Sequence, residues 1–417
     1  MKVLQLGIEN FRGIKNAKID FDSHVTILLG KNGSGKSSLI DATAALLSWV
    51  VARLRSESGR GSWIEDNDIR NGANSSEIQL VCSGLGLAEE FEFSMNKARK
   101  GSSTGRASQW SSLNERGKWI RAALTTGEID SLPVLAFYPV SRAVLDIPLR
   151  IRVEHRFRPI DAYESAMQGS ANFRVFFEWF RNREDLENET RLNDGNLEFR
   201  DHQLKAVRSA IEHFMPSFSS LSVKRSPLRM EIKKEGARLL INQLSVGEKC
   251  LLAMIGDLAR RLAIANPNLS NPLLGNGVIL IDEIDLHLHP HWQRTTIRNL
   301  VNVFPNCQFI VSTHSPQIIG ELAPKHLRIL RIDADGKFQS SIPESSLGLD
   351  SAEILETIMD TDVRNHEVDI ALGKIFLSID KEEFSQAKQM VEQLKLQLNG
   401  SIPELVRAET MIAVLEP

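Results

Sequence analysis

Gly30–Ser37 reads GKNGSGKS, and this stretch decides the fold. It has the pattern G-x-x-x-x-G-K-S, it follows the apolar run HVTILL (residues 24–29), and it precedes a stretch rich in Leu, Ala and Ile. A strand, a glycine-rich turn and a helix in this order form a βα unit with a phosphate-sized loop. The pattern predicts an α/β fold that holds phosphate at the start of a helix.

Each residue type in this loop has a physical role toward phosphate. Glycines let the backbone curl so that its N–H groups point at phosphate oxygens, and the helix N-terminus adds partial positive charge. Lys36 is predicted to neutralise the β- and γ-phosphates, and Ser37 to offer its hydroxyl to Mg²⁺. ATP and Mg²⁺ are therefore the expected cofactors, with loop contacts from Gly30, Asn32, Gly33, Ser34, Gly35, Lys36, Ser37 and Ser38.

Two later segments supply the groups that hydrolysis needs. VILIDE (residues 278–283) is an apolar strand that ends in two acids, so Asp282 is predicted to hold the Mg²⁺ shell with Ser37, and Glu283 to polarise the attacking water. His314 follows the strand QFIVS, where an imidazole can contact the γ-phosphate and hold the geometry of the water. We expect Glu283 and His314 to be the catalytic residues.

A fourth element, LSVGEK (residues 244–249), opens a predicted helix and lies between the phosphate loop and VILIDE. The Ser245 hydroxyl, the Gly247 N–H and the helix dipole are suited to a γ-phosphate. Ser245, Gly247 and Glu248 are accordingly predicted to contact the nucleotide.

The chain divides into four expected parts. Residues 1–145 form an N-terminal lobe with the phosphate loop, and residues 146–222 form a helical insert that contains FRVFFEWF. Residues 223–335 form a C-terminal lobe, and residues 336–417 form a helical extension for association with a partner or with itself. The expected architecture is a mixed sheet with flanking helices, a helical insert and a helical C-terminal tail.

Composition narrows the classes of protein. The 417 residues are 42% hydrophobic and 25% charged, which is typical of a globular protein. The sequence contains no run of about 18 apolar residues, so no membrane helix is expected. The start shows no secretory pattern. The three cysteines form no CxxC pair, which fits a reducing compartment, so a cytoplasmic protein without membrane association is expected.

The four elements in this order resemble the ABC ATPase heads of the SMC, RecF and OLD-like group. NFRGIKN (residues 10–16) is similar to the opening of that group, which implies that Arg12 reaches the nucleotide. The resemblance also implies that the LSxGE element faces the phosphate loop of a second copy, so that two heads enclose two ATP molecules. Residues 284–287 would then form the D-loop at that interface, with Asp285 near the nucleotide.

One departure from this group concerns the Q-loop. The expected glutamine is absent, and PVLAFYPVSR (residues 133–142) takes its place, with Ser141 and Arg142 as candidate substitutes. Magnesium coordination and the rate of hydrolysis are therefore less firmly predicted than nucleotide binding.

A closer resemblance is to the bacterial ATPases that include PtuA of the Septu anti-phage system and related retron modules. It is carried by AFYPVSR, FFEWFRNREDLENE, EIDLHLHP and STHSPQII. The residues after STHSP lack the acidic cluster of a TOPRIM nuclease, and no HNH-type cluster is visible. The resemblance implies an ATPase that is not itself a nuclease and that regulates or assembles a separate HNH nuclease.

Several alternatives remain at this stage. The chain could be a RecF-like DNA-repair ATPase, or a nucleotide-locked switch with negligible turnover.

The basic residues of segment 97–121, with Trp110 and Trp119 among them, could bind nucleic acid or could form a solvated loop with internal ion pairs. A second basic cluster, Arg150 to Arg158, has the same two interpretations. His287, His289 and His291 could bind metal, or could serve the D-loop and the next helix.

Overall fold

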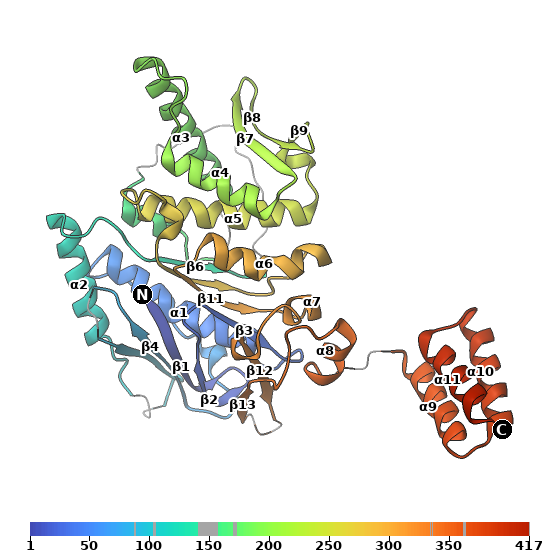
Figure 1. Ribbon diagram of the computed structural model, residues 1–417. Helices are drawn as coiled ribbons and strands as arrows, with labels where there is room; N and C mark the ends of the chain where they lie inside the picture. The colour runs from blue at the N-terminus through green and yellow to red at the C-terminus, as the bar shows by residue number, and fades with distance from the viewer. Residues whose placement is uncertain are drawn as a thin grey trace. The chain divides into compact units, whose positions relative to one another are not determined.

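The computed structural model describes residues 1–86, 89–102, 106–140, 157–169, 173–333, 335, 337–361 and 364–416. The chain forms two compact units, Met1–Asp350 and Ser351–Pro417. The first unit has the predicted α/β class, with a mixed sheet and flanking helices (Figure 1). Each unit is described below by itself.

The central sheet of the first unit has the order β13-β12-β3-β11-β10-β6. Its strands are parallel except β13, which pairs antiparallel with β12. Every residue of β3, β10 and β11 is buried, because a parallel sheet is covered on both faces and its strands read as continuous apolar runs. The bounds are β3 Val25–Leu29, β6 Val134–Tyr138, β10 Gly277–Ile281, β11 Cys307–Ser312, β12 Leu327–Ile332 and β13 Phe338–Ser341.

A second, antiparallel sheet has the order β2-β1-β4-β5. In β4 buried residues alternate with partly exposed ones, the pattern of a strand with one face against the core. The bounds are β1 Lys2–Phe11, β2 Ile14–Asp20, β4 Ser75–Ser83 and β5 Phe91–Ala98. The sequence predicted β1, β4 and β5 but not β2, whose apolar residues are spaced too irregularly to mark a strand without its partner β1.

Helix α1 (Lys36–Arg55) packs against strands of both sheets and against α2 (Ser111–Thr126). In the described part of the chain it is the one helix long and apolar enough, by length and composition alone, to cross a membrane. Its most apolar window is 61% buried inside the fold. Its apolar composition therefore serves the core between the two sheets.

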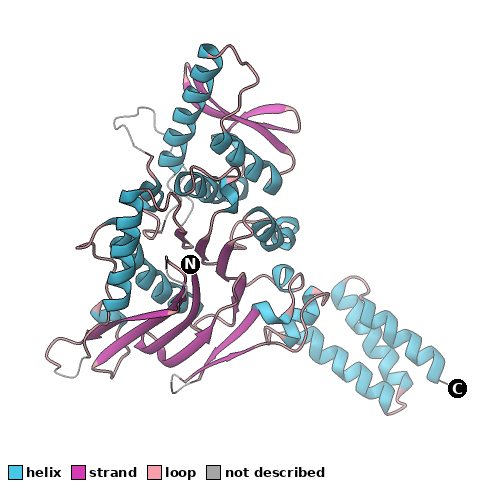
Figure 2. Ribbon diagram, turned by 60° about the vertical axis from the view of Figure 1, so that its left-hand side comes forward, coloured by secondary structure: helices cyan, strands magenta, loops and turns pink. Residues whose placement is uncertain are grey.

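A lobe beside the central sheet combines α3 (Phe173–Asn193), α4 (His202–Phe214) and α5 (Val246–Ala265) with a small antiparallel sheet β7-β8-β9 (Figures 1 and 2). The strands span Phe218–Arg225, Leu228–Lys234 and Ala237–Leu240. The aromatic run predicted to be helical lies in α3, where Phe176 packs so closely on α5 that a Cβ at Gly256 would lie 3.0 Å from its ring. Helices α6 (Pro290–Val303) and α7 (Pro316–Ile319) complete the unit.

A fully buried ionic cluster joins α5 to the central sheet. Asp257 accepts hydrogen bonds from Arg260 (2.7 Å), Arg261 (2.7 Å) and the Tyr138 hydroxyl at the end of β6 (2.9 Å). Arg261 also donates to the carbonyls of Ala162 and Glu164. Burial by itself would raise the pKa of Asp257, but the two guanidinium groups hold it below its ordinary value. The cluster therefore fixes α5 against β6.

The second unit is helical, as predicted for the C-terminal tail. It contains α8 (Ser351–Thr357), α9 (His366–Asp380), α10 (Phe384–Leu398) and α11 (Pro403–Leu415). In α10, Ala387, Val391 and Leu394 lie in the core of this unit, and Phe384 and Leu398 pack against it. Within residues 336–417, β13 belongs to the central sheet, and the helical unit begins at Ser351.

Asp257→Ala is expected to lower the free energy of unfolding by about 3–5 kcal/mol, because it leaves two buried guanidinium groups without their counter-charge. Tyr138→Phe removes one hydrogen bond from the same cluster and should cost about 1 kcal/mol. Urea unfolding of both variants checks this difference. Equal losses in the two variants would contradict the ionic role of Asp257.

Candidate nucleotide-binding site

The phosphate loop lies between the carboxyl end of β3 and the first turn of α1. Gly30 and Gly35 have φ values of 147° and 93°, a region that side chains disfavour. A Cβ at Gly30 would lie 2.5 Å from the Leu330 carbonyl oxygen, and one at Gly35 would lie 3.0 Å from the Ile332 side chain. Strand β12 thus leaves room only for glycine at these two positions, and the loop curls as its pattern predicts.

Lys36 spans its own loop. Its buried amine donates to the carbonyls of Gly30 (2.7 Å) and Lys31 (3.1 Å). Burial lowers the pKa of Lys36, while nearby carboxylates oppose the shift. The buried Ser34 hydroxyl has no hydrogen-bond partner in the described chain. A phosphate oxygen would satisfy both groups, so the loop fits the nucleotide that its sequence predicts.

The remaining loop residues are accessible to a ligand. Asn32, Gly33 and Ser37 are exposed, and Ser38 is half-buried. The Ser37 hydroxyl and the Asp282 carboxylate are oxygen donors of the type that Mg²⁺ prefers, and this ion keeps several waters, so two protein ligands suffice. These residues therefore fit the predicted magnesium site.

The two acids after β10 are held by a residue that the sequence did not single out. The Ser312 hydroxyl, at the end of β11, donates to the Asp282 carboxylate and accepts from the Glu283 amide (2.8 Å). Glu283 has a left-handed φ of 47°, which turns the chain away from the strand. Ser312 ends a buried strand that is parallel and adjacent to β10, and only this pairing, which no local pattern in the sequence shows, places it beside the two acids.

Asp285 and His314 lie together across two loops. The Asp285 carboxylate accepts from the Thr313 hydroxyl (2.5 Å) and from the His314 amide (3.3 Å). Gln293 joins the same loops, since it donates to the Leu288 carbonyl and accepts from the Ser315 hydroxyl. The predicted D-loop is therefore fixed to the segment that carries His314.

The charges of this site act on each other. Burial and the positive charge of Lys36 lower the pKa of the half-buried His314, while Asp285, Glu283 and Asp282 act in the opposite direction. Lys36 in turn is affected by the same three carboxylates. The structure thus brings together five predicted residues, and their charges with burial hold the pKa of His314 below its ordinary value.

The LSVGE element forms the capped N-terminus of α5. The Ser245 hydroxyl accepts from the Glu248 amide (3.3 Å), and Glu248 accepts from the Ser245 amide (2.8 Å) and pairs with Lys234 (2.6 Å). A Cβ at Gly247 would lie 2.2 Å from the His287 carbonyl oxygen, so the helix start touches the D-loop through a position that requires glycine. These residues form a second group, centred on the start of α5 rather than on Lys36.

Arg12 is paired with two carboxylates. Its guanidinium contacts Asp41 of α1 (2.6 Å) and Asp68 (2.8 Å). Burial by itself would lower the pKa of Arg12, but the two carboxylates raise it above its ordinary value. The residue therefore links the turn after β1 to the helix that follows the phosphate loop, and its predicted contact with the nucleotide remains a proposal.

His289 serves the entry of α6, one of the two interpretations offered by the sequence. Its Nδ1 accepts from the His291 amide (3.3 Å) at the helix N-terminus. Over the described residues, no group of three or more His, Cys, Asp or Glu side chains is arranged to hold a metal ion.

The basic segment 97–121 includes the end of β5, which extends to Ala98, and the first part of α2, which begins at Ser111. Arg99 donates to the carbonyls of Ala73 and Ile69, and the buried Arg116 donates to those of Gly84 and Glu89. Trp110 stacks on Trp49 with 4.4 Å between ring centroids. Most of this segment is therefore engaged within the fold.

Other expectations fall outside the described residues. They include the candidate Q-loop substitutes Ser141 and Arg142 and most of the second basic cluster. Arg158, which is described, pairs with Asp161.

Comparison with known proteins assigns the family. The family model described as "AAA domain, putative AbiEii toxin, Type IV TA system" (AAA_21) matches residues 25–320. The chain belongs to this family. The "Retron Ec83 probable ATPase" of Escherichia coli is 32% identical to this chain over 427 residues, which cover 88% of this chain and 78% of that protein.

Two further comparisons concern the resemblances noted in the sequence. Septu protein PtuA of Bacillus thuringiensis is 30% identical over 189 residues, or 44% of this chain and 48% of PtuA. The SMC head domain from Thermotoga maritima is 18% identical, with a TM-score of 0.44, and the match covers 82% of this chain and all of the head. The predicted resemblance to the retron ATPases and to Septu PtuA is confirmed. Nucleotide binding, typically with Mg²⁺, follows from the family.

Ser312→Ala is expected to lower the ATPase rate about 10- to 100-fold, the usual effect of removing a group that orients metal-binding or catalytic residues. Nucleotide binding should persist, since Lys36 is unchanged. Phosphate release and nucleotide affinity are measured together, with Ser340→Ala on the exposed strand β13 as the control. A Ser312→Ala rate equal to that of the control would contradict the positioning role.

The imidazole of His314 is expected to titrate below the ordinary value of 6.5, and Lys36→Ala should raise its pKa because one opposing positive charge is removed. The unfolded chain binds this proton more readily, so His314 reduces stability as the pH falls below 6.5. Nuclear magnetic resonance titration of the His314 ring in both proteins tests the shift. An unchanged pKa in Lys36→Ala would show that the two groups do not interact.

Proposed function

We propose that this chain is the ATPase subunit of an anti-phage defence system, which binds and slowly hydrolyses ATP between two heads and regulates a separate effector nuclease. The observation that carries the proposal is the grouping of Lys36 with Asp282, Glu283, Asp285 and His314 in one electrostatic environment. This set contains a phosphate ligand, a metal ligand and candidates for orienting water. The names of the retron and Septu relatives support the biological setting.

In the proposed mechanism the amine of Lys36 leaves its loop carbonyls and binds the β- and γ-phosphates. Ser37 and Asp282 would hold Mg²⁺, which would supply positive charge to the phosphate groups. Glu283, fixed through its amide by Ser312, orients the attacking water, and His314 contacts the γ-phosphate. The phosphate loop supplies amide donors throughout.

A dimer of heads is proposed because the LSVGE group is separate from the Lys36 group. The Val246 side chain, in the first turn of α5, is 58% exposed, and an exposed apolar residue beside a capped helix N-terminus suits a contact with another protein surface. In the proposed dimer, Ser245 and Gly247 meet the γ-phosphate held by the partner. Their contact with the D-loop would let each head respond to the nucleotide of the other.

The effector is proposed to be an HNH nuclease on another chain, on the basis of resemblance to Septu proteins. The helical unit supports a role in association, since the apolar side chains of Leu396 and Val414 are 81% and 77% exposed.

Native mass spectrometry with and without Mg-ATP tests the dimer. Glu283→Gln should bind ATP without turnover and accumulate as a dimer, whereas Lys36→Ala should remain monomeric because it lacks the phosphate ligand. Phosphate release should be lost in both variants. A Glu283→Gln protein that binds ATP but stays monomeric would overturn the dimer, and full turnover in Glu283→Gln would overturn its catalytic role.

The effector proposal has its own experiment. The tagged chain is expressed with its chromosomal neighbours, and the purified complex is weighed and assayed for phage protection. An HNH nuclease that copurifies with wild-type ATPase, together with loss of protection in Lys36→Ala, is the expected result. Protection without any such partner would overturn the proposed division of labour.

A further inference from the structure

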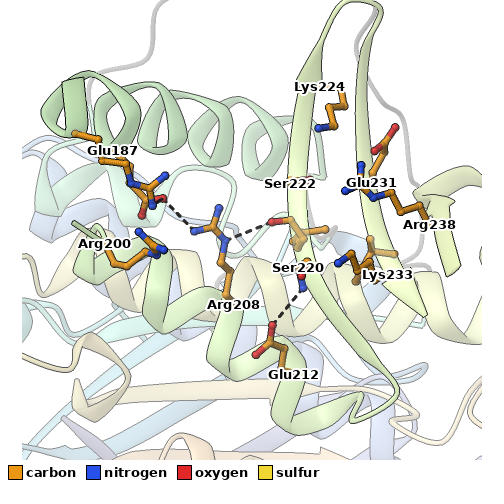
Figure 3. Close-up of a pocket in the computed structure, with 13 residues that line it drawn as sticks. Glu187, Arg200, Arg208, Glu212, Ser220, Ser222, Lys224, Glu231, Lys233 and Arg238 are labelled. Carbon is orange, nitrogen blue, oxygen red and sulfur yellow. Dashed lines mark hydrogen bonds and ion pairs between the residues drawn. The ribbon is translucent and has the colours of Figure 1, made fainter. Parts of the chain in front are cut away.

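A groove lies in the lobe that contains α3, α4 and the β7–β9 sheet, and none of its lining residues belongs to the nucleotide site (Figure 3). Its volume is about 450 Å³, in the range of ligand-binding cavities. Three of the lining side chains are acidic and six are basic, namely Arg191, Arg200, Arg208, Lys224, Lys233 and Arg238. The lining therefore has a formal surplus of three positive charges.

The acidic side chains of the groove are already bound to other groups. Glu187 is buried and accepts from Arg191 (2.6 Å) and Arg208 (3.4 Å), and Arg208 also donates to the Leu221 carbonyl (3.3 Å) (Figure 3). Glu231 pairs with Arg229 at 2.6 Å, outside the lining. Glu212 accepts from the Ser220 amide (3.3 Å). Glu187, Arg191 and Arg208 therefore form a hydrogen-bonded floor. The acidic side chains of the groove do not pair with its cations Lys224, Lys233 and Arg238.

Three cations on the sheet remain uncompensated. The side chains of Lys224, Lys233 and Arg238 form no hydrogen bond or ion pair with any residue that the structure describes. The strand register sets Lys233 directly opposite Arg238, whereas Arg229, which lies opposite Lys224, is already paired with Glu231. Like charges that face each other across an antiparallel pair destabilise the sheet. An anion bound between them would remove this repulsion.

The residues that line the groove favour a chain of phosphates over a nucleoside as the ligand. The lining side chains contain no aromatic ring, so the groove offers no face on which a base could stack. Lys224 and Arg238 are exposed, so the cations are open to solvent. A bulge between Ser219 and Ser222, with a left-handed φ of 54° at Ser220, interrupts the β7–β8 pairing beside the groove.

We propose that this groove binds the backbone phosphates of a single nucleic-acid strand without reading its bases. Lys224, Lys233 and Arg238 contact successive phosphates, and the bonded floor of Glu187, Arg191 and Arg208 holds the wall in place. The site is independent of the proposed ATPase cycle, and its binding is measured without ATP.

The probe is a fluorescently labelled 12-mer of deoxythymidine, titrated with the full chain and followed by anisotropy. The groove variant Lys224→Gln/Lys233→Gln/Arg238→Gln should bind at least about ten-fold more weakly than wild type. The control Lys18→Gln/Lys325→Gln/Lys381→Gln removes the same charge from exposed positions elsewhere, so the formal net charge falls from −3 to −6 in both. The control should bind like wild type.

Salt dependence gives a second measurement. Three phosphate contacts predict that log K of the wild-type protein falls with log salt at a slope of about −2, and the groove variant should lose this slope. Thermal unfolding should show the groove variant at least as stable as wild type, because the like-charge pair of Lys233 and Arg238 is removed. Lys233→Gln alone, with a smaller loss of binding, serves if the triple variant does not fold.

Three outcomes would overturn the proposal. Equal loss of binding in the groove and control variants would show a general charge effect. Unchanged binding in the groove variant would place the strand elsewhere. Calorimetric binding of inorganic tripolyphosphate in the groove, without binding of the 12-mer, would identify a free polyphosphate as the ligand.

Discussion

Three buried parallel strands, β3, β11 and β10, end at the same edge of one sheet, and the nucleotide site depends on this constraint. Residues after such strands must leave the sheet at neighbouring points, and their polar groups must find partners there. Ser312 meets this need for two residues at once, because it binds the Asp282 carboxylate and the Glu283 amide. The register between adjacent strands therefore fixes the relative positions of the phosphate loop, the two acids and His314.

The lobe with α5 is fixed to this sheet by a different type of interaction. Asp257, Arg260, Arg261 and Tyr138 are all buried, and the single carboxylate of Asp257 accepts from both guanidinium groups and from the Tyr138 hydroxyl. The helix that carries them begins at Ser245 and touches the D-loop at Gly247, so its two halves contact separate parts of the ATPase.

The charged residues of the β7–β9 sheet differ from this buried cluster. Its interior carboxylates are paired with arginines, whereas the three cations along β7–β9 face each other or stand alone among the described residues. Sheets usually avoid opposed like charges, so their presence beside a groove is better explained by a ligand than by stability of the sheet alone.

Local patterns in the sequence determined the phosphate loop, the order of the motifs and the extent of α5 and β10. Glycine spacing and continuous apolar runs have direct structural meaning, and the same loop predicted both the fold class and the nucleotide. The roles of Ser312 and Asp257, the strands β2 and β7, and the packing of Arg116 and Trp110 were decided only by tertiary structure. Each depends on a partner distant in the chain, such as Asp282 for Ser312 or Trp49 for Trp110, and no local periodicity encodes that pairing. The sequence showed where basic residues lie, but the fold decided which of them remain without a partner.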